Sequence, residues 1–332
     1  MYKKLMVCMC LMTSLCGQWV SRYHSVLPLM NLTDKAQSIF ERTDIAPFSQ
    51  LIWSFGAPDK ILNLEFYIQV RDAHTKQWGT WIKMLEYHQG KYTTFVNDLK
   101  GGQGYFHVRY EMGKNHRADG FKIKALAPDN KSFALVYLTV TTSAVDLFQP
   151  EQALKVAPGK RSIHLNKVSR ISQFKVDHPR NNEICSPSTC TMLINYVLKK
   201  PYNPLHVAQS VYDHGLARYG SWPCNMAYAN QCAHGKFYFY VTRMSGFAEL
   251  HSVLAQGVPV GVSITGPITG GATEYKSGHL ILIVGWDARK KEILCHDPAH
   301  DLNQSCPIRY KLADFLSAWE KSRRLAYVAC QT

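Results

Sequence analysis

The sequence has no cysteine between residues 17 and 184, no Cys-x-x-Cys pair and no arginine-rich run. Without the paired spacing that zinc sites use, the cysteines and histidines form no metal-binding pattern, and no cofactor is implied. The sequence also lacks a nucleic-acid-binding motif, so we expect no nucleic acid partner. Beyond the first twenty residues no apolar run is long enough to cross a bilayer, and we expect no integral membrane segment there.

Acidic residues are the scarce class of charge. The chain has 38 lysines and arginines against 24 aspartates and glutamates, which gives a formal net charge of +14. Such an excess attracts anionic surfaces, among them acidic cell-surface polymers, although charge alone does not select one. The length of 332 residues and the 46% of hydrophobic residues are typical of a globular protein with two domains.

The first twenty residues have the pattern of an export signal. Residues 1–4 form a short basic start, residues 5–15 form an apolar core, and residues 16–18 offer a cleavage point. The apolar core is too short to span a bilayer comfortably. We therefore expect a signal peptide over residues 1–20 and an exported protein, either periplasmic or secreted.

Seven cysteines remain after removal of such a signal, and all of them lie in the C-terminal half. An odd number of cysteines in an exported protein predicts one free thiol and up to three disulfides. Short loops make Cys224 with Cys232, and Cys295 with Cys306, the candidate disulfide pairs, although the sequence does not fix the pairing. The seven residues are Cys185, Cys190, Cys224, Cys232, Cys295, Cys306 and Cys330.

Residues 40–145 have the two-residue periodicity of β-strands. In residues 62–70 every second residue is apolar, and turn residues separate this run from several similar ones. Short strands at this spacing predict an all-β sandwich, here an accessory domain. Residues 146–170 lack a sustained period and are expected to form a linker. Residues 171–332 have helical segments first and strands after them, which is the order of an α+β domain.

Cys185 precedes Ser186 and Pro187 and an apolar helical run that ends near Leu198. Proline is favoured in the first turn of a helix, so this pattern places Cys185 at a helix N-terminus. The positive end of the helix dipole stabilises a thiolate, the form of cysteine that attacks a carbonyl carbon. We therefore predict that Cys185 is the free thiol and a nucleophile; a buried structural or disulfide-bonded cysteine is the alternative.

His279 begins one strand-like run and Asp297 ends another, and a short polar loop joins the two runs. If the turn centres near residue 288, a hairpin places His279 opposite Asp297 or Pro298, with a Cβ separation of ~5 Å. An aspartate there accepts a hydrogen bond from one ring nitrogen and leaves the other nitrogen for a thiol. A sheet histidine with a structural role and a turn aspartate are the alternatives.

Gln173 lies twelve residues before Cys185. Its side-chain amide is a candidate to stabilise an oxyanion, together with the backbone N–H of Cys185. The glycine-rich residues 266–271 are not followed by the Lys-Ser or Lys-Thr of a phosphate-binding loop. We expect these residues to form a mobile loop before His279.

Seven segments of the sequence, taken in their order and spacing, resemble those of a known protein family. They are residues 185–189 (CSPST), 192–196 (MLINY), 221–229 (SWPCNMAYA), 240–244 (YVTRM), 257–260 (GVPV), 278–286 (GHLILIVGW) and 296–299 (HDPA). Together they resemble the bacteriocin-processing-peptidase-like family of papain-fold cysteine peptidases, family thirty-nine of the cysteine peptidases, in its exported branch without transporter domains. The β-rich first domain also resembles one that such proteins often carry.

The resemblance implies a papain-like fold for residues 171–332. It also implies hydrolysis of a peptide or isopeptide bond in a peptide or protein substrate, through a thioester and without a cofactor. The site residues that it implies are Cys185 as nucleophile, His279 as general base, Asp297 as the residue that orients the base, and Gln173 as oxyanion donor.

Two other classes of function stay open. A transamidase or acyltransferase passes the same thioester to an amine or another acceptor. A non-catalytic wall- or glycan-binding module uses the first domain, where Trp78 and Trp81 are either half-buried strand residues or a stacking platform for sugar. The complete set of Cys185, His279 and Asp297 favours an enzyme.

Overall fold

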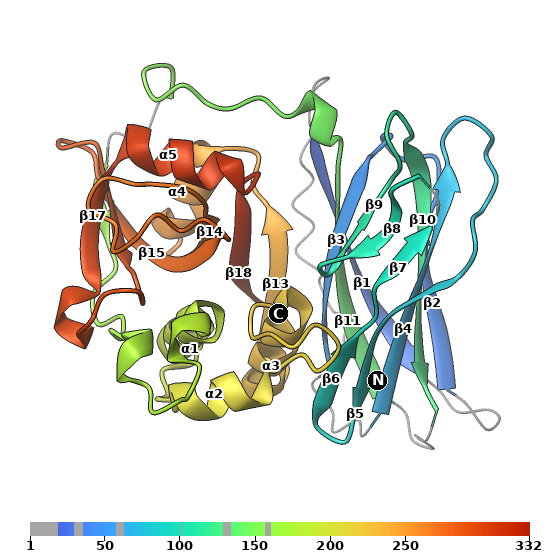
Figure 1. The fold of residues 1–332 in the computed structure, drawn as a ribbon, viewed down its shortest axis with the longest axis horizontal. Helices are drawn as coiled ribbons and strands as arrows, with labels where there is room; N and C mark the ends of the chain where they lie inside the picture. Colours follow the sequence, from blue (N-terminus) through green and yellow to red (C-terminus); the bar gives the residue numbers. More distant parts are fainter. Residues whose placement is uncertain (1–18, 30–35, 58–62, 100, 129–133, 157–160) are drawn as a thin grey trace, which may run out of the picture.

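The computed structural model describes residues 19–29, 36–57, 63–99, 101–128, 134–156 and 161–332. Almost all of the expected export signal therefore lies outside the described residues. In Figure 1 the chain forms two parts side by side, a β-sandwich from the first half and a mixed part of helices and strands from the second. The prediction of an α+β fold preceded by an all-β sandwich is confirmed.

Two antiparallel sheets pack face to face in the sandwich, and their apolar residues alternate toward the space between them. Aromatic rings fill this core, where Phe55 of one sheet and Phe66 of the other have ring centroids 4.4 Å apart. In spatial order the first sheet contains β1 (Val20–Leu29), β11 (Ala134–Ser143), β3 (Gln50–Gly56), β9 (Arg109–Glu111), β8 (Gln103–Phe106) and β7 (Asn97–Leu99). The second contains β2 (Ala36–Arg42), β10 (Ala118–Ala127), β4 (Asn63–Asp72), β5 (Ile82–His88) and β6 (Lys91–Thr94).

The sandwich takes in more of the chain than residues 40–145. Strand β1 begins at Val20 and pairs along its whole length with β11, so a strand that starts far before residue 40 completes the first sheet. The expected linker, residues 146–170, also contributes to the second part. Its residues Ile163 and His164 form β12, which pairs with Trp286 and Gly285.

The second part is a seven-stranded antiparallel sheet with helices on both faces. Its strands are β13 (Phe237–Arg243), β18 (Leu325–Gln331), β14 (Val260–Ile264), β15 (His279–Asp287), β16 (Glu292–His296) and β17 (Pro307–Lys311), with β12 paired to β15. The helices are α1 (Cys185–Leu198), α2 (Pro204–Ser210), α3 (Trp222–Ala233), α4 (Phe247–Ala255) and α5 (Leu312–Lys321). Within the described ranges, no helix is long and apolar enough to cross a membrane.

The position of β15 in the sheet explains why its sequence is a continuous apolar run rather than an alternating one. Leu280 and Leu282 belong to the core that includes α1, whereas Ile281 and Ile283 belong to the core that includes α4 and α5. Because helices cover both faces of the sheet, every residue of the strand meets apolar neighbours. The strand that carries His279 is therefore fixed from both sides.

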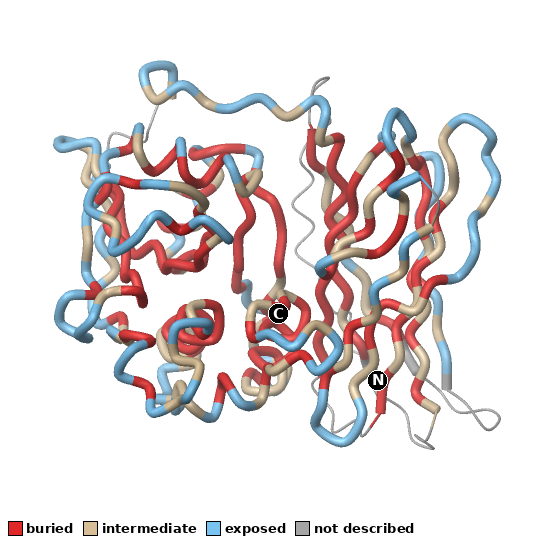
Figure 2. Tube along the Cα trace, in the orientation of Figure 1, coloured by how far each residue is buried: buried red, intermediate tan, exposed pale blue. Residues whose placement is uncertain are grey.

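The two parts of the chain share one hydrophobic core. Buried residues of the sandwich, of α1, α3 and β13 form a single packed cluster, and Figure 2 shows buried backbone on both sides of the boundary. Asn230 of α3 connects them directly, because its Nδ2 donates to the carbonyls of Phe55, at 3.2 Å, and of Phe239, at 2.8 Å. A side chain on Gly56 would overlap Asn230, at 2.6 Å. The accessory domain is therefore part of the packed molecule and not a separate module.

No disulfide joins any of the seven cysteines in the described residues, so neither candidate pair is bonded. Cys224 and Cys232 lie on the same helix, α3, and eight residues of helix span ~12 Å, which is beyond the reach of a disulfide. Cys295 donates its S–H to the carbonyl of Ile308, and Cys306 donates to that of Leu302. The prediction of these disulfides rested on sequence distance, which does not report where the side chains lie.

Candidate active site

Cys185 is the first residue of α1, at the N-terminal end of the helix. No side chain caps this end, so its N–H groups and the positive end of the dipole face the sulfur region without a competing carboxylate. Two hydrogen bonds attach the helix start to the sheet. Thr189 donates to the carbonyl of Leu280 at 2.9 Å, and the hydroxyl groups of Ser186 and Tyr327 lie 2.9 Å apart.

His279 and Asp297 are brought to the same place by neighbouring strands. His279 is the first residue of β15, and Asp297 follows the last residue of β16. The Nε2 of His279 lies 2.7 Å from Oδ1 of Asp297. The ring also hydrogen-bonds to the Cys185 thiol, for which the other nitrogen, Nδ1, is left. The structure thus brings Cys185, His279 and Asp297 together in one row of contacts.

The hairpin register differs from the expected one. We expected His279 directly opposite Asp297 or Pro298, but Leu282 pairs with His296 and the register shifts at a bulge between Ile283 and Gly285. Pairing of β16 stops at His296, and the Asp297 N–H donates instead to the carbonyl of Cys306 at 2.8 Å. Asp297 therefore reaches the ring by a diagonal side-chain contact rather than as a directly opposed partner.

Asp297 is fully buried and accepts hydrogen bonds on both oxygens. Oδ1 accepts from His279 and from the Ala299 N–H at 2.9 Å, while Oδ2 accepts from the hydroxyls of Tyr275, at 2.7 Å, and Tyr310, at 2.9 Å. Burial favours the neutral acid, but the charge and hydrogen bond of His279, with the donors from Ala299 and Tyr275, lower the pKa of Asp297 well below its usual range. The carboxylate therefore stays ionised beside the ring.

The pKa values of Cys185 and His279 move toward an ion pair. Burial by itself raises the pKa of the Cys185 thiol, but the hydrogen bond and charge of His279 and the backbone N–H of Leu280 outweigh it, so the pKa is lowered. Burial lowers the pKa of His279, whereas the charge and hydrogen bond of Asp297 raise it, to about 10 in total. Between the two pKa values the site holds a thiolate beside an imidazolium.

Tyr275 is a site residue that sequence analysis missed. Its ring stacks on the His279 ring with centroids 4.3 Å apart and planes 3° apart, and its hydroxyl also accepts the N–H of Ala272 at 3.0 Å. The residue is 5% exposed and has a positive φ of 47°, which an irregular loop rather than a strand or helix supplies. Neither periodicity nor a motif marks it in the sequence, since the loop is held by contacts that exist only in the fold.

Replacement of Tyr275 by leucine is expected to lower kcat of a reaction carried by Cys185 by about 10- to 100-fold, because the unsupported ring of His279 no longer stays aligned. Tyr275→Phe keeps the stack and loses one donor to Asp297, and Tyr310→Phe loses the other donor without contacting the ring. Both phenylalanine variants should retain most of the activity. Steady-state kinetics and pH profiles separate the three; equal losses in all of them would show that the stack has no positioning role.

Gln173 lies next to the segment that carries Asp297. It begins the short helix η2 (Gln173–Lys175), which packs against η3 (Asn181–Glu183), the turn just before Cys185. Its N–H donates to the carbonyl of Pro298 at 2.8 Å. Its side-chain oxygen is buried with no hydrogen-bond partner among the described residues. The role of Gln173 as an oxyanion donor stays a prediction.

No group of three or more histidine, cysteine, aspartate or glutamate side chains in the described ranges is arranged to hold a metal ion. The donors around Asp297 are instead two phenols, an imidazole and an amide N–H. These groups hold a carboxylate rather than a cation.

Comparison with known proteins finds a family match for the second half of the chain. Residues 165–327 match the model of the Peptidase_C39 like family. Among solved structures the chain is similar to xylellain, a cysteine protease from Xylella fastidiosa, with 11% identity, a TM-score of 0.33, and coverage of 56% of this chain and 91% of that one. It is also similar to PirA, with 10% identity, a TM-score of 0.19, and coverage of 36% and 93%. No curated protein matches the chain.

Proposed function

Because this chain is a cysteine peptidase whose residues 165–327 belong to the Peptidase_C39 like family, we propose that it hydrolyses peptide or isopeptide bonds through Cys185, His279 and Asp297. The observation that carries this assignment is the contact chain from the Cys185 thiol to the His279 ring and from Nε2 of that ring to the buried Asp297. These contacts link a nucleophile, a base and an orienting carboxylate in a single row.

In the acylation step the Cys185 thiolate attacks the substrate carbonyl carbon, and a C–S bond forms. The imidazolium of His279 gives its proton to the leaving nitrogen as the C–N bond breaks, which leaves a thioester and a neutral imidazole. Asp297 keeps Nε2 protonated throughout, so Nδ1 is the nitrogen that exchanges the proton with sulfur and substrate.

In the deacylation step His279 takes a proton from water, and the hydroxyl oxygen attacks the thioester. The C–S bond breaks, the acid product leaves, and the pair of thiolate and imidazolium is restored. We assign the developing oxyanion to the N–H of Cys185 and the side-chain amide of Gln173, which lies against the turn before the nucleophile. Transfer of the thioester to an amine is the competing outcome, and mass analysis of products with an added amine distinguishes it.

We propose that the enzyme is exported and acts where thiols are exposed to oxidation. The basic and apolar start of the chain supports this location. Four of the seven thiols are protected from oxidation by burial, which excludes the oxidant and raises the pKa of each thiol. They are Cys190, Cys224, Cys295 and Cys306. The basic charge supports contact with an anionic cell-surface polymer.

Treatment of the native protein with iodoacetamide at pH 6 is expected to modify Cys185 first and to abolish peptide hydrolysis in parallel. His279 lowers the pKa of this thiol, whereas burial raises the pKa of Cys190 and Cys224 and keeps the reagent out. Mass mapping of the modified peptides identifies the site. Cys330, an exposed residue, is the comparison thiol. Hydrolysis that survives full modification of Cys185 would overturn the proposed function.

A further inference from the structure

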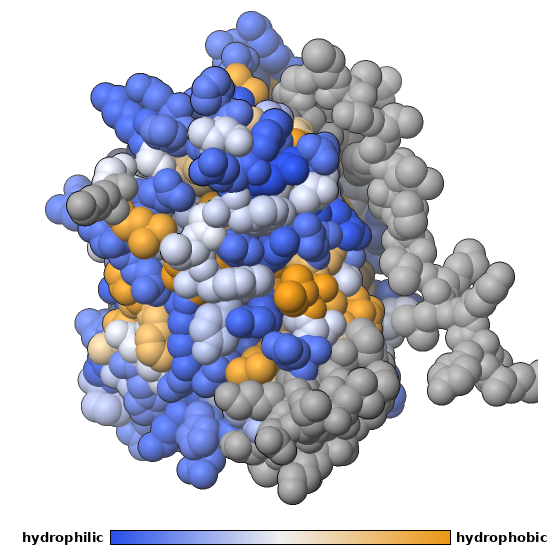
Figure 3. Space-filling view, turned by 90° about the vertical axis from the view of Figure 1, so that its right-hand side faces the viewer, coloured by the Kyte–Doolittle hydropathy of each residue, from blue (hydrophilic) through white to orange (hydrophobic). Residues whose placement is uncertain are grey.

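In the described part of the chain, no element packs on the outer face of the five-stranded sheet of the sandwich, in contrast to the six-stranded sheet. Strand β13 of the peptidase part packs against β3 and β11 of the six-stranded sheet. Apart from its edge strand β6, which contacts Asp213 and His214, the five-stranded sheet lies on the far side of the sandwich, away from the peptidase part (Figure 1). Figure 3 views the molecule from that side, where hydrophobic side chains interrupt a mostly polar surface. This face is therefore available to a partner.

Aromatic rings and lysines alternate on this outer face. Across neighbouring strands Ile39, Lys124 and Tyr67 stand in one row. The ammonium of Lys124 lies 4.5 Å from the Tyr67 ring centroid and 4.8 Å from that of Trp81, and Lys122 lies 4.1 Å from that of Trp78. We call these residues the aromatic–lysine face: Tyr67, Trp78, Trp81, Lys122 and Lys124.

The aromatic–lysine face is partly exposed, and other residues of the same strands fill the sandwich core. Trp81 is 36% exposed and Ile39 is 48% exposed. The apolar side of the same strands is already filled by residues such as Phe66, Ile68 and Ile123, which are fully buried. An exposed tryptophan ring leaves apolar surface in contact with water and adds no contact to the core. Exposed aromatic rings of this kind are typical of a ligand-binding surface.

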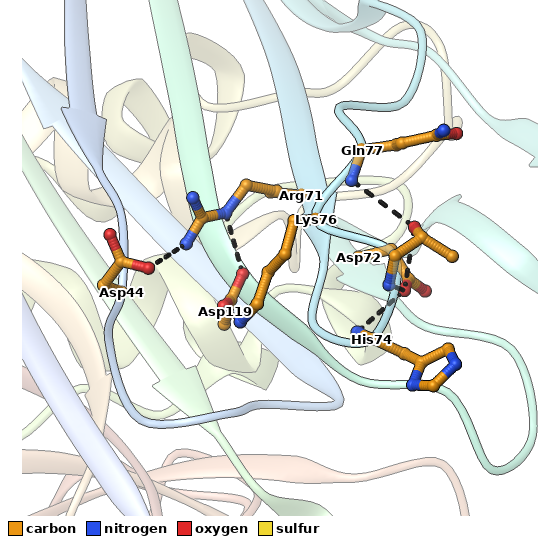
Figure 4. A network of polar contacts seen from close by, with 8 residues as sticks. Asp44, Arg71, Asp72, His74, Lys76, Gln77 and Asp119 are labelled. Atoms are coloured by element: carbon orange, nitrogen blue, oxygen red, sulfur yellow. Dashed lines mark hydrogen bonds and ion pairs between the residues drawn. The ribbon is translucent and has the colours of Figure 1, made fainter.

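A turn held by hydrogen bonds and ion pairs precedes Trp78, and Figure 4 shows this polar network. Asp72 accepts the N–H groups of His74 and Thr75 at 2.9 and 2.8 Å. The nearly buried Asp119 pairs with Lys76 and, at 2.9 Å, with Arg71. The turn then returns to β4, where the residue after Trp78 donates its N–H to the carbonyl of Val70 at 2.9 Å. Binding therefore needs little ordering of this turn.

Among the described residues, one ammonium group on the face has no carboxylate partner, in contrast to its neighbours. Lys122 pairs with Glu41 at 3.5 Å, and the neighbouring Lys83 pairs with Glu65 and Glu86 at 3.1 and 2.7 Å. Lys124 has no ion pair with a carboxylate in the described part of the chain. Held between two rings, its ammonium is a donor for an anionic group of a ligand that also packs on those rings.

We propose that the aromatic–lysine face binds a glycan polymer that carries carboxylate groups. Sugar rings present flat C–H faces that pack on aromatic side chains, and their hydroxyl and carboxylate groups accept hydrogen bonds from lysine. An open sheet face suits an extended chain rather than a small molecule, and the net charge of +14 favours an acidic one. The proposal does not rest on the catalytic residues, which lie in the other half of the chain.

The test measures binding of polygalacturonate by the full chain with Cys185→Ala, by calorimetry at fixed salt. Trp81→Ala and Lys124→Gln are each expected to raise Kd by about tenfold. The matched control is Lys155→Gln, which removes the same charge from an exposed position of the linker and should leave Kd unchanged. Neutral dextran and phosphatidylglycerol vesicles are the comparison ligands, and thermal melting shows that each variant is folded.

Weaker polygalacturonate binding by the two face variants alone supports the proposal. An equal loss with Lys155→Gln, or no loss with Trp81→Ala, overturns it, because binding is then a property of total charge. Dextran bound as tightly as polygalacturonate overturns the assignment to an acidic glycan. Vesicle binding without polygalacturonate binding, or no binding of any of the three, overturns it as well.

Discussion

Replacement of His279 by alanine is expected to lower kcat/KM for peptide hydrolysis by about 10⁴-fold or more, since the residues of such a triad act as a unit. Two effects add. The variant loses the acid that protonates the leaving nitrogen, and it loses the charge and hydrogen bond that lower the pKa of Cys185. Burial then prevails and raises that pKa, so the thiol is protonated at neutral pH.

The second effect gives a measurement independent of substrate. In the wild type we expect Cys185 to react readily with iodoacetamide at pH 6, and in His279→Ala the reaction should become slow and recover only at alkaline pH. His296→Ala is the matched control, because this second buried histidine of the same hairpin contacts the Ser169 carbonyl, at 2.8 Å. Alkylation at pH 6 that is as fast in His279→Ala as in the wild type would contradict the ion pair.

Replacement of Asp213 by alanine is expected to destabilise the whole molecule by about 3–5 kcal/mol, because it leaves several buried donors without a partner. Asp213 is fully buried between the two parts of the chain. Its Oδ1 accepts the N–H groups of Thr94, at 3.0 Å, Gly215, at 3.0 Å, and Leu216, at 3.3 Å, and its Oδ2 accepts the Ser221 hydroxyl. One of these donors belongs to the sandwich and three to the peptidase part.

Chemical denaturation of Asp213→Ala measures the loss, and Asp213→Asn is the control. The asparagine oxygen still accepts the three N–H groups and its amide donates to Ser221, so about 1 kcal/mol is expected. Gly215→Ala tests the contact between the two parts by steric overlap, since the added Cβ would lie 1.9 Å from the Thr94 carbonyl oxygen. If both parts melt separately and only one responds to Asp213→Ala, the shared core does not couple them.

The parts of the site that the sequence predicted are those that local patterns encode. Pro187 after Cys185 marks the helix start, and the run from His279 marks a strand that is buried on both faces. Asp297 was found because a hairpin limits which residues can meet. The register itself was not predictable, since the bulge at Gly285 lies where β12 approaches, and a side chain there would lie 2.4 Å from the Ile163 carbonyl.

What the sequence did not predict depends on contacts between distant segments. Helix α3 and strand β13 were not predicted, and these two elements complete the core shared with the sandwich. Tyr275 and Asp213 carry polar groups that matter only because of the backbone N–H groups and hydroxyls that the fold brings to them. Sequence distance also misled in the case of Cys224 and Cys232, which one helix holds apart.

Strand β18 has a consequence for when the enzyme becomes active during synthesis. Residues 325–331 lie between β13 and β14, next to the edge strand of the sheet, and Tyr327 contacts Ser186 beside the nucleophile. A nascent chain that has not yet released this strand from the ribosome cannot close the sheet. Translation order therefore delays activation of the thiol until β18, which is made after every other strand of this sheet, has inserted.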